Sequence, residues 1–284
     1  MNILEIINFG AKKLRQKNID TFIIDSELLL SKTLNKRREE VLINFDQEIC
    51  QKHFDIYKKL ILRRSQHEPI AYIIEEKEFW SKNFFVNTNT LIPRPETELM
   101  VEKLIKIFKK KKISILDIGT GSGCILISLI SELKKSKGVG IDISKKAIAV
   151  AKKNLKRHKL NKKINFINKA LDSKFSQKFD LIVSNPPYIE SDAIKNLSRD
   201  VKRYEPSIAL DGGNDGLDLI KKVIYKAQYI LKVKGMLALE IGNEQFKKVS
   251  KILNKNDFKI EYAIKDYKEN IRCIISTYVG KQYE

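Results

Sequence analysis

Four consecutive residues, Asn185-Pro186-Pro187-Tyr188, directly follow the mostly apolar run Phe179–Ser184. The run predicts a buried parallel strand, and two prolines prevent its continuation as strand or helix. Because proline has no N–H and a fixed φ, the carbonyl oxygens of Asn185 and Pro186 are expected to point outward without a local partner. With the Asn185 side-chain oxygen and the Tyr188 ring, they suit an –NH2 on a flat π-system, such as an amide or an exocyclic base amine. Taken alone, the motif is equally well explained as a turn that ends a strand.

A glycine-rich segment, D-I-G-T-G-S-G at residues 117–123, follows an earlier predicted strand and opens a helix. Glycines at alternate positions let the backbone turn tightly and approach a ligand closely. The spacing is G-x-G-x-G, not the G-x-G-x-x-G of dinucleotide binding. Asp117, just before the glycines, is poorly placed beside a pyrophosphate and well placed for an ammonium group. The alternative is that the glycines only shape a tight strand–helix turn.

A second carboxylate, Asp142, ends the next predicted strand. At this place a carboxylate can accept hydrogen bonds from both hydroxyls of a ribose. A ligand with a ribose, an amine and no phosphate is S-adenosylmethionine. Since open α/β sheets bind ligands at the carboxyl ends of their strands, Asp142, the glycine loop and Asn185 are expected in one crevice. We therefore expect methyl transfer to a planar nitrogen through positioning and electrostatics, with no metal and no covalent enzyme intermediate.

The elements that position these loops follow two patterns. Residues 1 to about 66 show helical periodicity, which predicts a small helical bundle. From Pro69 to Pro93 the pattern turns extended, with Ala71–Ile74 as its first run, and predicts a β-hairpin linker. From about Glu96 helices and strands alternate, which predicts an α/β fold with a doubly wound, mostly parallel sheet.

Seven strands are expected in this second part, at 113–118, 138–141, 164–167, 179–184, 235–241, 259–263 and 272–278. No helix joins the last two, so one of them should run antiparallel at or near an edge of the sheet. The chain thus divides into a helical bundle (1–68), a hairpin linker (69–94) and a catalytic domain (95–284).

Composition narrows the class of protein. Of 284 residues, 43% are hydrophobic and 32% are charged, which is typical of a globular protein. No run approaches 18 apolar residues and no secretory signal is apparent, so we expect neither a membrane span nor export. Three scattered cysteines without a C-x-x-C pair, and three histidines without ligand spacing, argue against disulfides and a metal site. We expect a cytoplasmic protein.

The formal net charge of +20 is compatible with nucleic-acid binding. The lysines are scattered, however, and lysine, asparagine and isoleucine together are what an A/T-rich coding sequence would produce. Charge alone does not identify the substrate, and we expect no stable nucleic-acid partner and a monomer.

The block L-I-P-R-P-E-T-E at residues 91–98, together with D-I-G-T-G-S-G, N-P-P-Y and the helical region before them, resembles the HemK/PrmC family. Further likeness lies at 68–72, 78–80, 204–206, 211–213, 239–242 and 266–267. The resemblance implies a class I S-adenosylmethionine-dependent methyltransferase fold. It implies methylation of the side-chain amide (N5) of the glutamine in the Gly-Gly-Gln motif of class-1 peptide chain release factors. The N-terminal bundle would recognise that protein substrate.

The resemblance also assigns residues by position. The cofactor set is Asp117, Gly119, Thr120, Gly121, Ser122, Gly123, Asp142, Ala170 and Asn185. The substrate set is Asn185, Pro186, Pro187 and Tyr188, and the catalytic residues among them are Asn185, Pro186 and Tyr188. Ala170 stands where many relatives carry an acidic residue before a large side chain, so the adenine contact departs from the family pattern.

Two further blocks allow two interpretations each. Arg94 and Glu98 either orient the linker against the site or belong to a capped helix start. The segment D-G-G-N-D-G at 211–216 is either a glycine-rich loop near the substrate or simply a turn.

Three other activities remain open at this point. The first is methylation of a ribosomal-protein glutamine, which the R-P-E-T-E block makes less favoured. The second is adenine-N6 methylation of DNA or RNA, which shares N-P-P-Y but is usually accompanied by a large target-recognition region. The third is an RNA-binding adaptor that has lost catalysis, against which the intact Gly119, Asp142 and Asn185 argue.

Overall fold

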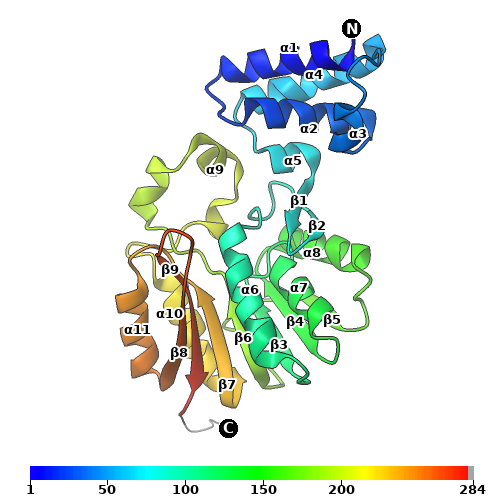
Figure 1. Cartoon of the computed structure of the whole chain (residues 1–284). Coiled ribbons are helices and arrows are strands. Elements are labelled where there is room, and N and C mark those ends of the chain that lie inside the picture. Colours follow the sequence, from blue (N-terminus) through cyan, green and yellow to red (C-terminus); the bar gives the residue numbers. More distant parts are fainter. Residues whose placement is uncertain (281–284) are drawn as a thin grey trace. The chain divides into compact units, whose positions relative to one another are not determined.

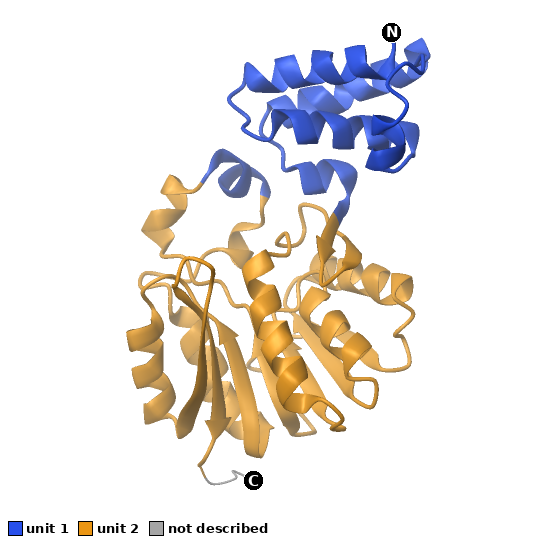
Figure 2. Ribbon diagram, in the orientation of Figure 1, with its two compact units in different colours: residues 1–76, 198–204 blue, residues 77–197, 205–284 orange. Residues whose placement is uncertain are grey.

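The computed structural model describes residues 1–280 and consists of two compact units (Figures 1 and 2). The first unit contains residues 1–76 and the later segment 198–204; the second contains residues 77–197 and the chain from residue 205 onward.

The first unit is helical. Its helices are α1 (Ile3–Arg15), α2 (Phe22–Leu34), α3 (Arg38–Leu42), α4 (Gln51–Ser65), α5 (Ile70–Ile74) and α9 (Arg199–Tyr204). A capping box between Asn2 and Glu5 begins α1, and fully buried apolar side chains such as Ile6, Leu29 and Tyr57 fill the space between the helices. The Tyr204 hydroxyl donates to the Gln66 carbonyl at 3.0 Å, so α9 is bonded to the end of α4.

The extended structure predicted for Ala71–Ile74 is wrong, because these residues belong to α5. Pro69 precedes the helix with φ −54°, and Glu75 ends it in the left-handed conformation. Ala71, Tyr72 and Ile73 are all buried. Packing on the helical core therefore outweighs the preference of the aromatic and β-branched side chains for strands.

The hairpin comprises β1 (Glu76–Phe79) and β2 (Lys82–Phe85). Phe79 and Phe84 are buried and meet edge to face, with 6.1 Å between ring centroids. The Trp80 N–H donates to Glu98 Oε1 at 2.9 Å, which fixes the hairpin to the helix that follows it.

The second unit is built on a seven-stranded sheet in the order β5-β4-β3-β6-β7-β9-β8. Its strands are β3 (Ser114–Ile118), β4 (Lys137–Asp142), β5 (Ile164–Asn168), β6 (Phe179–Ser184), β7 (Leu231–Glu240), β8 (Phe258–Lys265) and β9 (Ile271–Tyr278). All neighbouring pairs are parallel except β7–β9 and β9–β8. The predicted fold class is confirmed, including one antiparallel strand next to an edge.

Helices cover both faces of the sheet (Figure 1). They are α6 (Pro95–Phe108), α7 (Cys124–Glu132), α8 (Lys145–Arg157), α10 (Asp218–Ile230) and α11 (Phe246–Lys255). Side chains of α6, α7 and α8 share one buried cluster with Ile115 and Leu181, while those of α10 and α11 share another with Leu116 and Ile182. Adjacent strand residues point to opposite faces, so a strand buried on both sides reads as a continuous apolar run.

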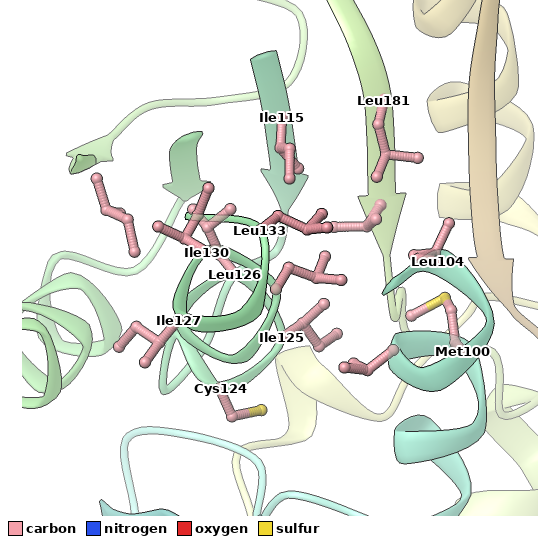
Figure 3. Packing of buried hydrophobic residues seen from close by; sticks show 14 of the residues in the cluster. Met100, Leu104, Ile115, Cys124, Ile125, Leu126, Ile127, Ile130, Leu133 and Leu181 are labelled. Carbon is pink, nitrogen blue, oxygen red and sulfur yellow. The ribbon is translucent and has the colours of Figure 1, made fainter. Parts of the chain in front are cut away.

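Figure 3 shows the first of these clusters, in which α7 and α6 pack side by side on one face of the sheet. Leu126 and Ile130 of α7 lie close to Ile115 of β3, and Met100 and Leu104 face the cluster from α6. This packing fixes the start of α7, and with it the glycine loop that precedes the helix. Among residues 1–280, none of the helices is both long and apolar enough to cross a membrane.

Candidate active site

The crevice of the second unit opens where the strand order reverses. β3 and β6 are hydrogen-bonded neighbours, although β4 and β5 lie between them in the sequence. The loops that leave β3 and β6 at their carboxyl ends therefore diverge on either side of one opening, the usual binding position in such sheets. These loops are the glycine segment and N-P-P-Y.

The glycine loop is shaped by three residues with positive φ: Gly119 (+70°), Gly121 (+53°) and Gly123 (+80°). The N–H groups of Gly119 and Thr120 both donate to the Ile141 carbonyl at 2.9 Å, which joins the loop to the end of β4. A Cβ at Gly119 would meet no heavy atom within 4 Å. A Cβ at Gly123 would lie 2.7 Å from the Phe166 ring. Gly119 thus borders free space, whereas Gly123 allows the loop to pack on the sheet.

Asp142, the last residue of β4, is hydrogen-bonded to the same glycine loop. Its Oδ2 accepts from the Gly121 N–H at 2.9 Å, and its Oδ1 accepts from the Ser144 N–H at 2.9 Å. Burial raises the pKa of this carboxyl, and the two backbone hydrogen bonds act against the increase. Each oxygen has further acceptor capacity, and Asp142 lines the cavity described next.

A cavity of about 670 Å³ occupies the crevice. Gly119, Thr120, Gly121 and Ser122 line it, together with Asp142, Ala170, Asn185 and Pro187. Its volume falls within the range of small-molecule sites, and the surface that lines it is mostly apolar. The space beside Gly119 and the acceptor pair of Asp142 fit S-adenosylmethionine.

The predicted adenine position, Ala170, also borders the cavity, with Ile143 and Leu171 beside it. Ile143 is 65% exposed despite being apolar, so its side chain is available to a flat ring. The preceding Lys169 has its ammonium over the Phe175 ring, 4.3 Å from the centroid. Ile143 and Leu171 therefore offer apolar contacts at this position of the cavity.

Asp117 lies elsewhere than predicted. It is fully buried and is not among the residues that line the cavity. Its Oδ2 accepts the Thr120 hydroxyl at 2.6 Å, and its Oδ1 has no hydrogen-bond partner among residues 1–280. Burial raises the pKa of Asp117 to about 7. The carboxyl lies beneath the loop because strand alternation turns residue 117 to the side that faces α7, and it orders Thr120.

The N-P-P-Y loop contributes unequally to the cavity. Asn185 and Pro187 line it, whereas Pro186 is buried and Tyr188 is not among the lining residues. Among the backbone–backbone hydrogen bonds of residues 1–280, none ends on the carbonyl oxygen of Asn185 or Pro186. The Asn185 Nδ2 donates to the hydroxyl of Thr97 at 3.4 Å.

The prediction that Tyr188 offers its ring to a substrate disagrees with its position. Its hydroxyl donates to Glu240 Oε1 at 3.3 Å and accepts from Arg272 Nη2 at 3.1 Å. Burial raises the pKa of the Tyr188 phenol. The side chain packs against the core cluster on the α10 side, and Glu240 and Arg272 bind its hydroxyl there.

The segment 211–216 supports the N-P-P-Y loop from behind. The Gly212 N–H donates to the Ile189 carbonyl at 2.8 Å, and a Cβ at Gly216 would lie 2.4 Å from the Tyr188 carbonyl oxygen. Gln245 Nε2 donates to the carbonyls of Tyr188 (3.0 Å) and Gly216 (3.2 Å). Glycine is needed at 216 because two loops meet there without space for a side chain.

The R-P-E-T-E block both begins a helix and forms long-range bonds. Pro95 is the first residue of α6, as expected for a helix start. Arg94 pairs with Glu205 at 2.5 Å, and the Glu205 side chain, 1% exposed, also accepts the Ile92 N–H. Arg94 lines the cavity, so this ion pair fixes its edge.

No sequence pattern predicts a functional role for four residues of this region: Thr97, Glu240, Gln245 and Arg272. Thr97 and Glu240 lie in blocks that carry the family resemblance, and that was the only signal for them. Their contacts join residues that are far apart along the chain, and no local pattern encodes such a pairing.

Family comparisons agree with the site. Residues 95–201 match the Methyltransferase small domain, and residues 5–74 match the PrmC N-terminal domain. The chain is 39% identical to the Release factor glutamine methyltransferase of Fusobacterium nucleatum, covering 96% of this chain and 78% of that protein. The chain belongs to the release factor glutamine methyltransferase family. The resemblance drawn from the motifs is confirmed.

Other relatives differ in length. A Release factor glutamine methyltransferase of Buchnera aphidicola is 38% identical, and the alignment covers both chains completely. A Rickettsia prowazekii protein named Bifunctional methyltransferase is 37% identical, but the chain spans only 57% of its length. The solved hMettl16 catalytic domain has a TM-score of 0.54 at 17% identity, covering 70% of this chain and 77% of that one, which shows a shared fold.

Gly119→Ala tests the loop as a cofactor cradle. Alanine in the left-handed conformation costs about 1–2 kcal/mol, and its Cβ would project into the free space beside the loop. We expect the dissociation constant for S-adenosylmethionine, measured by calorimetry, to rise by about tenfold or more. Unchanged affinity in a variant that melts like the wild type would contradict the assignment.

Asp117 makes stability depend on pH. The folded protein holds this proton more tightly than the unfolded chain, whose pKa is near 3.8, so its contribution to stability is full below 3.8 and is lost as pH rises to about 7. We expect the free energy of unfolding, measured with denaturant, to fall across that window by at most about 1.4 kcal/mol per pH unit relative to Asp117→Asn. Parallel pH profiles of the two proteins would refute the burial argument.

Proposed function

We propose that this chain transfers a methyl group from S-adenosylmethionine to the N5 amide nitrogen of the glutamine in the Gly-Gly-Gln motif of class-1 peptide chain release factors. The observation that carries the proposal is Asn185. This side chain lines the same cavity as Gly119 and Asp142, and it follows the strand next to the glycine loop. The names of the relatives support the choice of acceptor.

The residues of the chain would hold the cofactor as follows. The glycine loop leaves room for its chain, Asp142 accepts hydrogen bonds from its ribose, and Ile143 and Leu171 contact its adenine. The bound cofactor supplies an electrophilic methyl group on a sulfonium.

The acceptor nitrogen of an amide is a poor nucleophile because its lone pair is delocalised into the carbonyl. Asn185 Oδ1, at the cavity, would accept one of its N–H groups. Pro186 is itself buried, but no backbone N–H ends on its carbonyl oxygen, and we assign the second N–H group to that oxygen. Two such bonds orient the lone pair and favour a more tetrahedral nitrogen, and the apolar cavity keeps water away. Pro187 lines the site, and Tyr188 holds the loop from behind.

We propose a division of labour along the chain. The helical bundle (1–68) would recognise the release factor. The segment 69–94, which contains α5 as well as the hairpin, would connect the bundle to residues 95–284, and these would catalyse. The protein would act as a cytoplasmic monomer without a stable nucleic-acid partner.

A ribosomal-protein glutamine remains the second candidate acceptor, since the same cavity would hold the same amide. Adenine-N6 methylation would require a stacking platform for the base, and Tyr188 packs against the core cluster on the α10 side and is not among the residues that line the cavity.

Labelled S-adenosylmethionine distinguishes these acceptors. The protein is incubated separately with a class-1 release factor, ribosomal protein and nucleic acid. We expect label in the release factor alone, and none when its loop glutamine is replaced. Label in nucleic acid or ribosomal protein instead would overturn the proposal.

Asn185→Ala separates acceptor binding from cofactor binding. Loss of one preorganised acceptor is expected to lower turnover by about 10²–10³-fold. Cofactor affinity should fall much less, because Asp142 and the glycine loop remain. Asn165→Ala, at an exposed position of β5, is the matched control and should behave like the wild type. Equal loss of turnover and cofactor affinity would mean that Asn185 chiefly holds the cofactor.

A further inference from the structure

A series of hydrogen-bonded polar groups, here called the relay, leads from Asn185 through Thr97 and Glu240 to Tyr188 and Arg272. Thr97, in the first turn of α6, is 2% exposed and stands between Asn185 and Glu240. Glu240 is the last residue of β7 and is fully buried. Beyond it, the Tyr188 hydroxyl and the Arg272 guanidinium continue the chain.

The direction of each hydrogen bond follows from the groups involved. Arg272 can only donate, so the Tyr188 oxygen accepts from it and its own proton goes to Glu240 Oε1. The Thr97 hydroxyl donates its single proton to Glu240 Oε2 at 2.5 Å. Both oxygens of Glu240 therefore act as acceptors, which is the arrangement of a carboxylate.

The consequence reaches Asn185. With its proton given to Glu240, the Thr97 oxygen can only accept, so the amide must turn its Nδ2 toward Thr97. The Asn185 Oδ1 is then the atom left for the cavity. The residue itself lines the cavity.

We propose that Thr97 and Glu240 are positioning residues that lock the Asn185 amide with its oxygen toward the acceptor nitrogen. The inference rests on the proposed function, because it assigns that oxygen to the –NH2 of the methyl acceptor. A reversed amide would present –NH2 to –NH2, and two donors cannot bond. The relay thus sets both the rate and the preference for an –NH2 acceptor.

The hydrogen bonds from Thr97 and Tyr188 and the charge of Arg272 favour the accepting state of Glu240, against the raised pKa that its burial causes. Burial raises the pKa of Glu240, while the Thr97 hydroxyl, the Arg272 charge and the Tyr188 hydroxyl oppose the increase and Glu96 adds to it. These four groups come from α6, β9 and the N-P-P-Y loop, so the relay depends on elements distant in the sequence.

Thr97→Val removes the hydroxyl while keeping the shape of the side chain. Without the hydroxyl, either Oδ1 or Nδ2 of Asn185 can point to the cavity. We therefore expect kcat for the release factor to fall about 10- to 100-fold. KM for S-adenosylmethionine should stay near the wild-type value. Thr97→Ser restores the hydroxyl and should restore most of kcat. Ser128→Ala, a buried hydroxyl of α7 outside the relay, is the matched control.

A double-mutant cycle tests whether Thr97 acts through Asn185. In the Asn185→Ala background, Thr97→Val should have no further effect on kcat, because the amide that it orients is gone. Independent, additive losses would overturn the relay. Glu240→Gln keeps the shape but removes the charge that draws both protons, and should lower kcat in the same direction.

Side-chain amide resonances in ¹⁵N spectra give a readout that needs no acceptor. The Asn185 –NH2 pair is identified by its absence in Asn185→Ala. The chemical shifts of this pair should change in Thr97→Val and should not change in Ser128→Ala. A shift without any methylation of release factor would leave the relay standing and reject the proposed function. An unmoved pair, or wild-type kcat in Thr97→Val while the wild type labels release factor, would reject the relay.

Discussion

The active-site crevice depends on one topological constraint, the placement of β6 beside β3 after two strands have been added on the other side. Loops from neighbouring parallel strands leave the sheet at the same edge, and here they diverge because the connections cover opposite faces. The space between them receives the glycine loop from β3 and Asn185 after β6. The core clusters that fix α7 and α10 on the two faces therefore also determine the width of the site.

Three carboxylates at the ends of β3, β4 and β7 organise this edge in different ways. Asp142 reaches the cavity, whereas Asp117 and Glu240 are fully buried behind it. Asp117 orders the hydroxyl of Thr120, and Glu240 collects the protons of Thr97 and Tyr188. Burying a carboxylate is costly unless its oxygens are bonded, so Glu240, with both oxygens bonded, holds its neighbours in a defined orientation. Preorganisation of this kind suits a reaction that depends on placing a weak nucleophile.

Much of the fold could be predicted from the sequence because its signals are local. Apolar runs followed by Gly119 or Pro186 mark strands that end in loops, and alternation of helix and strand gives a parallel sheet. The short helix at Ile70–Ile74 could not be predicted, since only burial against distant helices outweighs its strand-like composition. Distant contacts also decide where the side chains of Asp117 and Tyr188 lie, which is why the sequence alone predicted both of them at the ligand. Which face a side chain takes depends on partners such as Thr120 and Arg272, which are found only in three dimensions.

We propose that the crevice holds the –NH2 of a glutamine side chain for methyl transfer. Tandem mass spectrometry of the release factor after reaction with the full chain and S-adenosylmethionine tests it most directly. We expect one added methyl group, located on the amide nitrogen of the Gly-Gly-Gln glutamine. A methyl group on another residue, or an unmodified loop glutamine despite consumption of the cofactor, would contradict it.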